Sequence, residues 1–94
     1  MAHILVHHKV EDYNRWKSVF DEHGSFRFEN GSKGGKVFRS AKDPNELFIL
    51  LEWESLDRLE IFSRSEGLKE AMQKSGVVGM PEVYYLEETA TSSK

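Results

Sequence analysis

The sequence predicts an α+β domain of the ferredoxin-like class, in which helices cover one face of a four-stranded antiparallel sheet. Apolar residues recur with a period of two in some segments and of about 3.6 in others. These segments follow one another in the order β-α-β-β-α-β, and the 94-residue chain is barely longer than that motif. We therefore expect a single domain over residues 1–88 and a polar tail over residues 89–94.

Strand-like runs cover residues 3–9, 36–40, 46–53 and 82–87 of the chain. Between the first two of these runs, local signals predict a helix. Asp12 is typical of a helix N-cap, and Tyr13 begins a helical pattern behind it. Gly24 could end this helix, but we expect it to continue to Asn30-Gly31, where glycine can adopt a left-handed conformation, and to direct Phe28 or Arg27 toward the sheet. A flexible Ser32–Gly35 segment then leads to the second strand.

The second half is bounded by turn and capping residues. Asp43-Pro44-Asn45 predicts a loop between the second and third strands, which form a hairpin. Ser55 and Ser65 are each placed to begin a helical segment, and Gly76 to end the second one. The helical spacing of apolar residues between these signals predicts two helical segments before the last strand.

The third strand indicates self-association. Its apolar run Leu47–Leu51, continued by Trp53, places bulky groups on both faces. A strand that is apolar on both faces is buried on both, whereas helices of this class cover only one. We expect the sheet of a second copy to cover the other face, giving a homodimer. The alternative is a monomer with an exposed apolar face, although large patches of that kind are rare.

Composition excludes several classes of protein. There are no cysteines for disulfides, so a small domain must gain stability elsewhere, and association is one route. The 13 basic residues are scattered among 16 acidic ones, without the cluster that nucleic-acid binding needs. The longest apolar run is far too short to cross a membrane, and the first residues lack the apolar core of a signal peptide. We expect a cytoplasmic protein with neither nucleic acid nor membrane as a partner.

Five parts of the sequence carry a resemblance to a known family. They are residues 3–10, 12–17 with 19–21, 34–40, 51–55 and 62–72. Together they resemble the dimeric α+β barrel superfamily, and in particular its antibiotic-biosynthesis monooxygenase-like domains, over residues 3–87. The resemblance implies the fold and the homodimer. It leaves the activity open, because the superfamily includes oxygenases, isomerases, haem-degrading enzymes and proteins of unassigned function.

Two branches of that superfamily can be compared residue by residue. The haem-degrading branch has a haem-ligating histidine where this chain has Met72, a pocket tryptophan at Phe62 and a strand-one asparagine at His8. These three departures argue against haem degradation. The quinol or anthrone oxygenase branch matches in fold, without a complete polar constellation. In that branch the substrate anion itself reduces oxygen, so the resemblance implies no metal and no other cofactor.

Three functions follow as hypotheses. The first is a cofactor-independent oxygenase of the monooxygenase-like type, acting on a small aromatic or polyketide-like molecule. The second is a non-catalytic protein that binds a small ligand in the same cavity. The third is a structural homodimer whose interior is filled by side chains. A pocket with convergent polar groups favours the first two, and a packed interior favours the third.

His8 is the expected catalytic residue. By the resemblance, Ile4, Val6 and His8 face the helices, where the pockets of the family lie, while Leu5 and His7 face the region between subunits. A histidine has an unperturbed pKa of about 6.5, so His8 could act as a base or a hydrogen-bond anchor near neutral pH. It could equally be a hydrogen-bonded residue that ends the strand. Neighbouring histidines on a strand point to opposite faces, so we expect no metal site.

Six further residues are expected to contact the substrate. They are Trp16, Phe20, Phe62, Met72, Arg39 and Glu52. The first four are apolar, and we expect them to form core as well as pocket walls. Arg39 interrupts an apolar strand and could hold an anionic substrate, or be solvated at a sheet edge. Glu52 could be an inward carboxylate with a raised pKa, or pair with a cation on a neighbouring strand.

Overall fold

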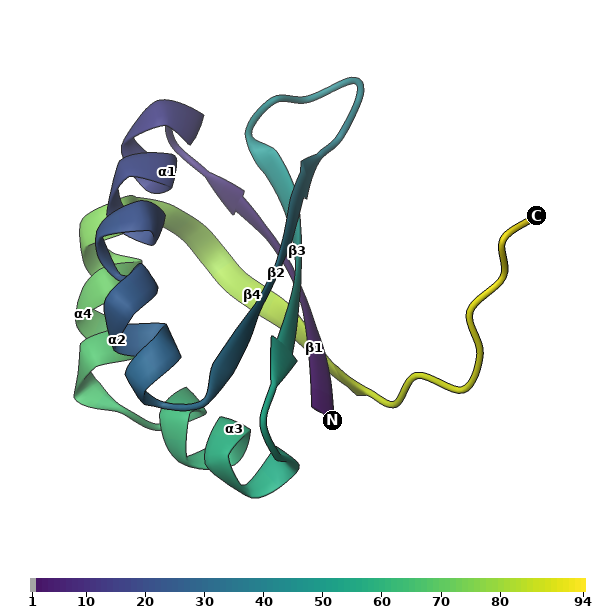
Figure 1. Ribbon diagram of the computed structural model, residues 1–94. Helices are drawn as coiled ribbons and strands as arrows, with labels where there is room; N and C mark the ends of the chain where they lie inside the picture. The colour runs from purple at the N-terminus through teal and green to yellow at the C-terminus, as the bar shows by residue number, and fades with distance from the viewer. Residues whose placement is uncertain (1) are drawn as a thin grey trace.

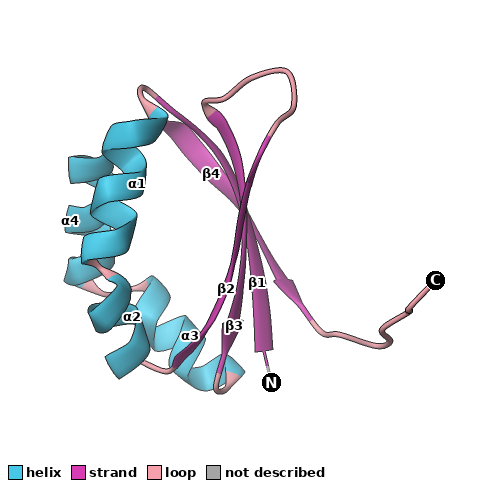
Figure 2. Cartoon of the chain, turned by 45° about the horizontal axis from the view of Figure 1, so that its top comes forward, coloured by secondary structure: helices cyan, strands magenta, loops and turns pink. Residues whose placement is uncertain are grey.

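Residues 2–94 are described by a computed structural model; Met1, the first residue of the expected domain, lies outside them. The described chain forms two layers, a sheet and a layer of helices (Figure 1). The strands are β1 (Ala2–Val10), β2 (Ser32–Arg39), β3 (Glu46–Trp53) and β4 (Val77–Leu86). The helices are α1 (Tyr13–Glu22), α2 (Gly24–Glu29), α3 (Leu56–Ser63) and α4 (Glu66–Ser75). Figure 2 shows the helices together on one side of the sheet.

The sheet has the strand order β2-β3-β1-β4, and its neighbouring strands pair antiparallel. Helices connect β1 to β2 and β3 to β4, while a loop connects β2 to β3. This arrangement confirms the expected α+β, ferredoxin-like class. After β4 the chain has neither helix nor strand, and Figure 1 shows it leading away from the sheet. Among residues 2–94, no helix is long and apolar enough to span a membrane.

The expected helix starts are confirmed by their capping hydrogen bonds. The Asp12 carboxylate accepts the backbone N–H of Asn14 at 3.2 Å, at the start of α1. The hydroxyl groups of Ser55 and Ser65 accept backbone N–H groups at the starts of α3 and α4, each at 3.2 Å. Gly76 ends α4 in the left-handed conformation, with φ 77°. Each of these interactions is local, which explains why sequence alone can predict it.

The first helical segment is not continuous, contrary to expectation. α1 ends at Glu22 and α2 begins at Gly24, with His23 between them at φ −87° and ψ 4°. Glycine stabilises a helix interior by about 1 kcal/mol less than alanine, and the helix breaks at this weak point. The expected end of the segment is confirmed, because Asn30 caps α2 and Gly31 follows with φ 109°.

The segment before the second expected strand is paired, and the prediction of a flexible approach was wrong. β2 begins at Ser32, and Gly34 and Gly35 lie opposite Glu52 and Leu51 of β3 after a register shift. A Cβ atom at position 35 would lie 2.2 Å from the Leu50 carbonyl oxygen, so only glycine fits beside β3. The last strand is likewise longer than expected, since β4 begins at Val77 rather than at residue 82.

We expect Gly35→Ala to destabilise the protein by about 1–3 kcal/mol, the usual cost of overpacking, because the carbonyl that it meets is backbone and cannot rotate away. Urea unfolding followed by tryptophan fluorescence measures the change. Gly24→Ala is the matched control: its Cβ would meet only the Arg27 guanidinium at 3.7 Å, and we expect no loss of stability. Equal stabilities of the two variants would contradict the close approach at Gly35.

The core lies between the sheet and the helices in two clusters. One contains Ile4, Trp53, Leu59 and Phe62, and the other contains Val10, Trp16, Leu47 and Ile49. Side chains alternate along a strand, so Leu47, Ile49, Leu51 and Trp53 of β3 face the helices, while Phe48, Leu50 and Glu52 face away from them. We call this second side of the sheet the open face. β3 is therefore apolar on both sides, as its sequence indicated.

Candidate ligand-binding site

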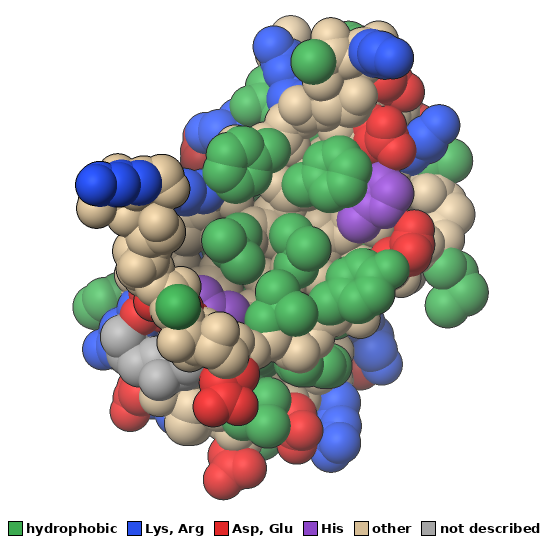
Figure 3. Space-filling model, turned by 90° about the vertical axis from the view of Figure 1, so that its right-hand side faces the viewer, with side chains coloured by type: hydrophobic (Ala, Val, Ile, Leu, Met, Phe, Trp, Pro, Cys, Tyr) green, Lys and Arg blue, Asp and Glu red, His purple; other side chains and the backbone are tan. Residues whose placement is uncertain are grey.

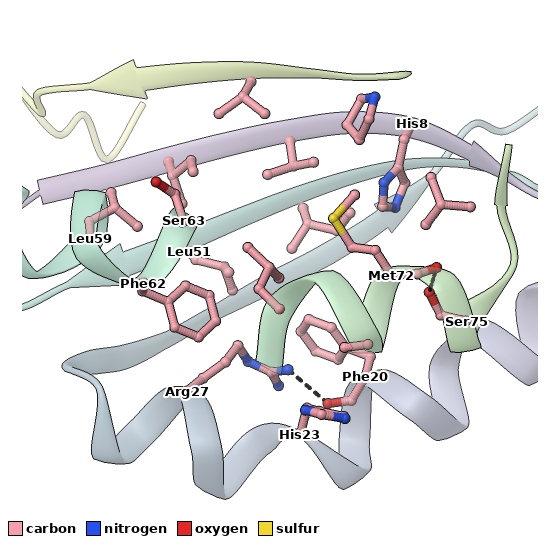
Figure 4. A pocket seen from close by; sticks show the side chains of 18 of the residues that line it. His8, Phe20, His23, Arg27, Leu51, Leu59, Phe62, Ser63, Met72 and Ser75 are labelled. Carbon is pink, nitrogen blue, oxygen red and sulfur yellow. Dashed lines mark hydrogen bonds between the residues drawn. The ribbon is translucent and has the colours of Figure 1, made fainter. Parts of the chain in front are cut away.

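A cavity of about 440 Å³ lies between the sheet and the helices (Figure 4). This volume is within the range of small-molecule sites, about 300–1,000 Å³. Its walls come from β1, β3 and β4 on one side and from all four helices of the described chain on the other. Most of the lining side chains are apolar or aromatic. Apart from the indole N–H groups of Trp16 and Trp53, the side chains with polar atoms are His8, His23, Arg27, Ser63, Ser75 and Tyr85, and no carboxylate of the described residues is among them.

His8 lies in the sheet-side wall with its imidazole among apolar groups. The residue is 8 % exposed, and neither Nδ1 nor Nε2 has a hydrogen-bond partner in the described chain. Its ring meets Trp16 edge-on, with the ring centroids 6.0 Å apart. Burial, with a smaller contribution from the charge of His7, lowers the pKa of His8 to about 4. At neutral pH the ring is uncharged and offers one N–H donor and one nitrogen acceptor.

An irregularity in β4 lies directly beside His8. β1 and β4 pair His7 with Glu82 and Lys9 with Val78, so His8 alone stands opposite the three residues 79–81. Gly79 has φ 72°, which permits this bulge, and Pro81 from the bulge lines the cavity. Bulges redirect side chains and are frequent next to functional sites. The bulge therefore shapes the cavity wall next to the imidazole.

Four of the expected substrate contacts lie in this cavity together with His8. They are Trp16 and Phe20 from α1, Phe62 from α3 and Met72 from α4. Trp16 stacks on Phe20 with the ring centroids 4.9 Å apart, and the ring centroids of Phe62 and Trp53 are 4.7 Å apart. The helices thus bring together residues that are more than 50 positions apart in the sequence. Figure 4 shows Phe20, Phe62 and Met72 lying across the cavity from the strands.

The other two expected contacts do not line the cavity. Glu52 lies on the open face because its neighbours Leu51 and Trp53 face the helices, and its carboxylate is 3.9 Å from His3 Nε2. Arg39 is at the end of β2, where its guanidinium lies 4.5 Å from the centre of the Tyr13 ring. Neither side chain can contact a ligand held in this cavity in the present conformation.

Arg27 is a cavity residue that the sequence indicated only in part. The helical pattern directed either Arg27 or Phe28 toward the sheet, and the structure places Arg27 in the wall and leaves Phe28 73 % exposed. Arg27 Nη1 donates to the Phe20 carbonyl oxygen at 2.8 Å, and its guanidinium lies 3.7 Å from the Phe20 ring centre. Gly24 is the sequence signal that could have identified Arg27 as a site residue, because the helix breaks beside it and Arg27 lies on the separate helix α2 that follows.

The open face carries a different polar group. His7 lies there, as the family resemblance implied, with Nε2 2.9 Å from Glu46 and Nδ1 3.0 Å from Glu82. Its ring stacks on Phe48 with centroids 4.4 Å apart. The hydrogen bond to Glu46, together with Glu82, raises the pKa of His7 despite some desolvation. Across residues 2–94, no group of three or more His, Cys, Asp or Glu side chains is arranged to hold a metal ion.

Comparison with known proteins decides the family. The model of the antibiotic biosynthesis monooxygenase family matches residues 2–74. The chain belongs to this family. No curated protein sequence matches it. The match spans β1 to Lys74, the next-to-last residue of α4, and so includes most of the residues that line the cavity.

Several solved structures share the fold of this antibiotic biosynthesis monooxygenase family member. SnoaB from Streptomyces nogalater, a cofactor-independent oxygenase, is 13 % identical and superposes with a TM-score of 0.82, covering 99 % of this chain and 97 % of SnoaB. A Bordetella bronchiseptica protein named for the same family is 15 % identical, with a TM-score of 0.82 and coverages of 95 % and 97 %. One from Caulobacter crescentus CB15 is 19 % identical, with a TM-score of 0.77 and coverages of 95 % and 90 %. At these identities the likeness establishes the fold alone.

Proposed function

We propose that the protein binds a small aromatic or polyketide-like molecule in the cavity and oxidises it with molecular oxygen, without a cofactor. One observation carries the proposal: the two ring nitrogens of His8 are buried without partners among apolar walls. Buried polar groups are nearly always hydrogen-bonded, so such a pair of atoms is suited to a ligand's hydroxyl or carbonyl group. Membership of the monooxygenase family, and the activity named for SnoaB, support oxidation as the reaction.

The reaction needs little from the protein beyond binding and orientation. In an anthrone-type substrate, a CH₂ group between two rings loses a proton to solvent, and the resulting carbanion reduces O₂ by forming a C–O bond. The peroxide takes up a proton, its O–O bond breaks as the second C–H proton is lost, and water leaves. In total, CH₂ and O₂ give C=O and H₂O. The substrate is the reductant, so no external electron donor is required. A cavity lined by apolar side chains would hold the anion away from bulk water.

His8 would act mainly as an anchor in this reaction. We expected a pKa near the working pH, but the pKa lies at about 4, which makes the free imidazole a weak proton acceptor at neutral pH. A neutral imidazole can still accept a hydrogen bond from a substrate hydroxyl or donate one to its oxygen. The hydrogen bond that the imidazole donates would strengthen as negative charge develops on the substrate oxygen.

Binding without turnover is the second candidate function. It is favoured by the absence of any carboxylate from the described lining and by the weak basicity of His8. A purely structural homodimer with a filled interior is disfavoured, since the interior contains a cavity of about 440 Å³.

We also propose that the protein is a homodimer that associates through the open face. Figure 3 shows apolar side chains gathered on this side of the sheet. Phe38, Tyr84 and Leu86 are 52 %, 46 % and 43 % exposed there, and Leu5 pairs with Leu50 and Tyr84 across three strands. A continuous apolar surface of this kind is typical of an interface. A second copy would present the same surface and could cover it symmetrically.

Incubation with anthrone in air-saturated buffer containing EDTA tests the oxygenase proposal. We expect anthrone and oxygen to be consumed in equal amounts, and His8→Leu to lower kcat/KM about ten- to a hundred-fold through loss of a hydrogen bond to developing charge. His8→Asn retains a donor and an acceptor and should lose less. His7→Gln, changed on the open face, is the control and should keep the activity.

Other outcomes separate the candidate functions. If anthrone binds in a His8-dependent manner but consumes no oxygen, the protein is a binder and the oxygenase proposal is wrong. If neither anthrone nor other fused aromatic rings bind, the cavity has no such function.

A further inference from the structure

Arg27 introduces a positive charge into a mostly apolar wall. It reaches the cavity from α2, on the helical side, whereas His8 reaches it from β1 in the sheet (Figure 4). The break at His23 starts α2 as a separate helix after α1, and Arg27 lies on it. The cavity therefore has a neutral polar group in one layer and a cation in the other.

The charge of Arg27 is poorly compensated by the protein. None of the ion pairs among residues 2–94 includes Arg27. Burial lowers the pKa of its guanidinium, and the charge of Asp21 partly opposes this shift. A guanidinium nevertheless stays protonated at neutral pH. Charges removed from water are stabilised by an ionic partner, and no carboxylate of the described residues forms an ion pair with this half-buried guanidinium.

A structural role explains only part of this side chain. The bond from Nη1 to the Phe20 carbonyl ties α2 to α1, and the stacking on Phe20 adds a cation–π contact. A guanidinium has five N–H donors in a planar fork, and the described residues accept from it at this one place. Arg27 also lines a second hollow of about 280 Å³ between α2 and β2, so it lies between two spaces. The guanidinium N–H groups that have no acceptor therefore lie beside these two spaces rather than against packed side chains.

We propose that the cavity selects an aromatic organic anion, with its carboxylate or phenolate oxygen bound by Arg27 and a neutral hydroxyl or carbonyl group held by His8. This rests on the proposed function and specifies its substrate class. The ring system lies against the aromatic and aliphatic walls, and the anionic group supplies the charge that the Arg27 site lacks. An uncharged imidazole cannot neutralise an anion, which places the negative group at Arg27 rather than at His8.

Two probes of the same shape test this inference: 2-naphthoate, an anion, and 2-naphthamide, its neutral counterpart. Their dissociation constants are measured at pH 7.5 by calorimetry. We expect 2-naphthoate to bind about ten-fold or more tightly than 2-naphthamide, the usual value of a charge-assisted hydrogen bond. Arg27→Met should lower the affinity for 2-naphthoate far more than that for 2-naphthamide and so remove the preference. Circular dichroism shows independently that the variant is folded.

Two variants serve as matched controls. Arg27→Lys keeps the positive charge and should keep most of the preference. Arg64→Met removes the same charge at an exposed position outside the cavity lining, and should leave the preference unchanged. A preference that falls equally in Arg27→Met and Arg64→Met would reflect general electrostatics and would overturn the assignment.

The remaining outcomes distinguish this inference from the proposed function. If both probes bind wild type with equal affinity, the cavity binds aromatic molecules but Arg27 does not select anions, and the inference alone is wrong. If neither probe binds and anthrone does not bind either, the proposed function fails and the inference fails with it. If anthrone binds but neither probe does, the inference alone is wrong. Where 2-naphthoate does bind, the same measurement with 2-naphthol at a pH above its pKa separates phenolate from carboxylate recognition. If 2-naphthoate binds tightly and ionised 2-naphthol does not, the group bound by Arg27 is a carboxylate.

Discussion

Ile49→Asp is expected to abolish folding, whereas the same change at the next residue, Leu50→Asp, leaves the domain folded. Ile49 is 3 % exposed within the core cluster around Trp16 and Leu47, so the variant would bury an unpaired carboxylate. That burial costs several kcal/mol, comparable with the stability of a small domain, about 5–15 kcal/mol. Leu50 faces the open side, where a carboxylate can reach water once the sheet is uncovered. Circular dichroism and urea unfolding distinguish the two variants.

The same pair tests the proposed homodimer. Wild type should sediment as a dimer at micromolar concentration, and Leu50→Asp as a folded monomer, because two like charges would be brought together in the apolar interface. Leu50→Met preserves volume and hydrophobicity and should remain dimeric. A stable wild-type monomer would show that the open face is not a self-association surface. A folded Ile49→Asp variant would contradict the assignment of the two faces.

Acid is expected to destabilise the wild-type protein through His8. The pKa of His8 is about 4 in the folded protein against 6.5 for an ordinary histidine, so between these pH values the unfolded chain binds more protons. Stability that is fully present above pH 6.5 is therefore lost progressively as the pH falls toward 4, by about 3 kcal/mol from this residue. In His8→Leu this contribution is absent.

The measurement is the difference in unfolding free energy between wild type and His8→Leu, taken from urea titrations at pH 7.5 and at pH 4.5. Carboxylates also titrate in this interval, but they do so in both proteins and cancel in the difference. His7→Gln is the control with the opposite sign. The pKa of His7 is raised, so its stabilising effect is complete below its unfolded pKa and is lost as the pH rises through the folded value. Parallel pH profiles for wild type and His8→Leu would contradict the burial of an uncharged imidazole.

Much of the fold could be predicted because its signals are local. β3 runs from Glu46 to Trp53, as its apolar run indicated, and Asp12, Ser55 and Ser65 cap the helices that were expected to begin at them. Capping depends on residues within one turn, and the faces of a strand follow from its period of two. For the same reason the opposite orientations of His7 and His8 could be deduced.

The candidate site was predictable in its apolar part and not in its charged part. Apolar spacing directs Trp16, Phe20, Phe62 and Met72 toward the sheet, and they meet around His8. The direction of a charged side chain at a sheet edge or on an alternating strand has no such signal. Arg39 and Glu52 were placed in the cavity by their chemistry, whereas packing places them elsewhere.

The sequence by itself determined the order of elements, the helix starts and the two apolar faces of β3, because periodicity and capping act between near neighbours. Only the tertiary structure decided that Gly35 pairs closely with β3, that β4 bulges beside His8 and that Arg27 enters the cavity wall. The low pKa of His8 belongs to the same group, since desolvation by surrounding elements is its main cause. These properties arise from contacts between segments far apart in the chain, which no local pattern encodes.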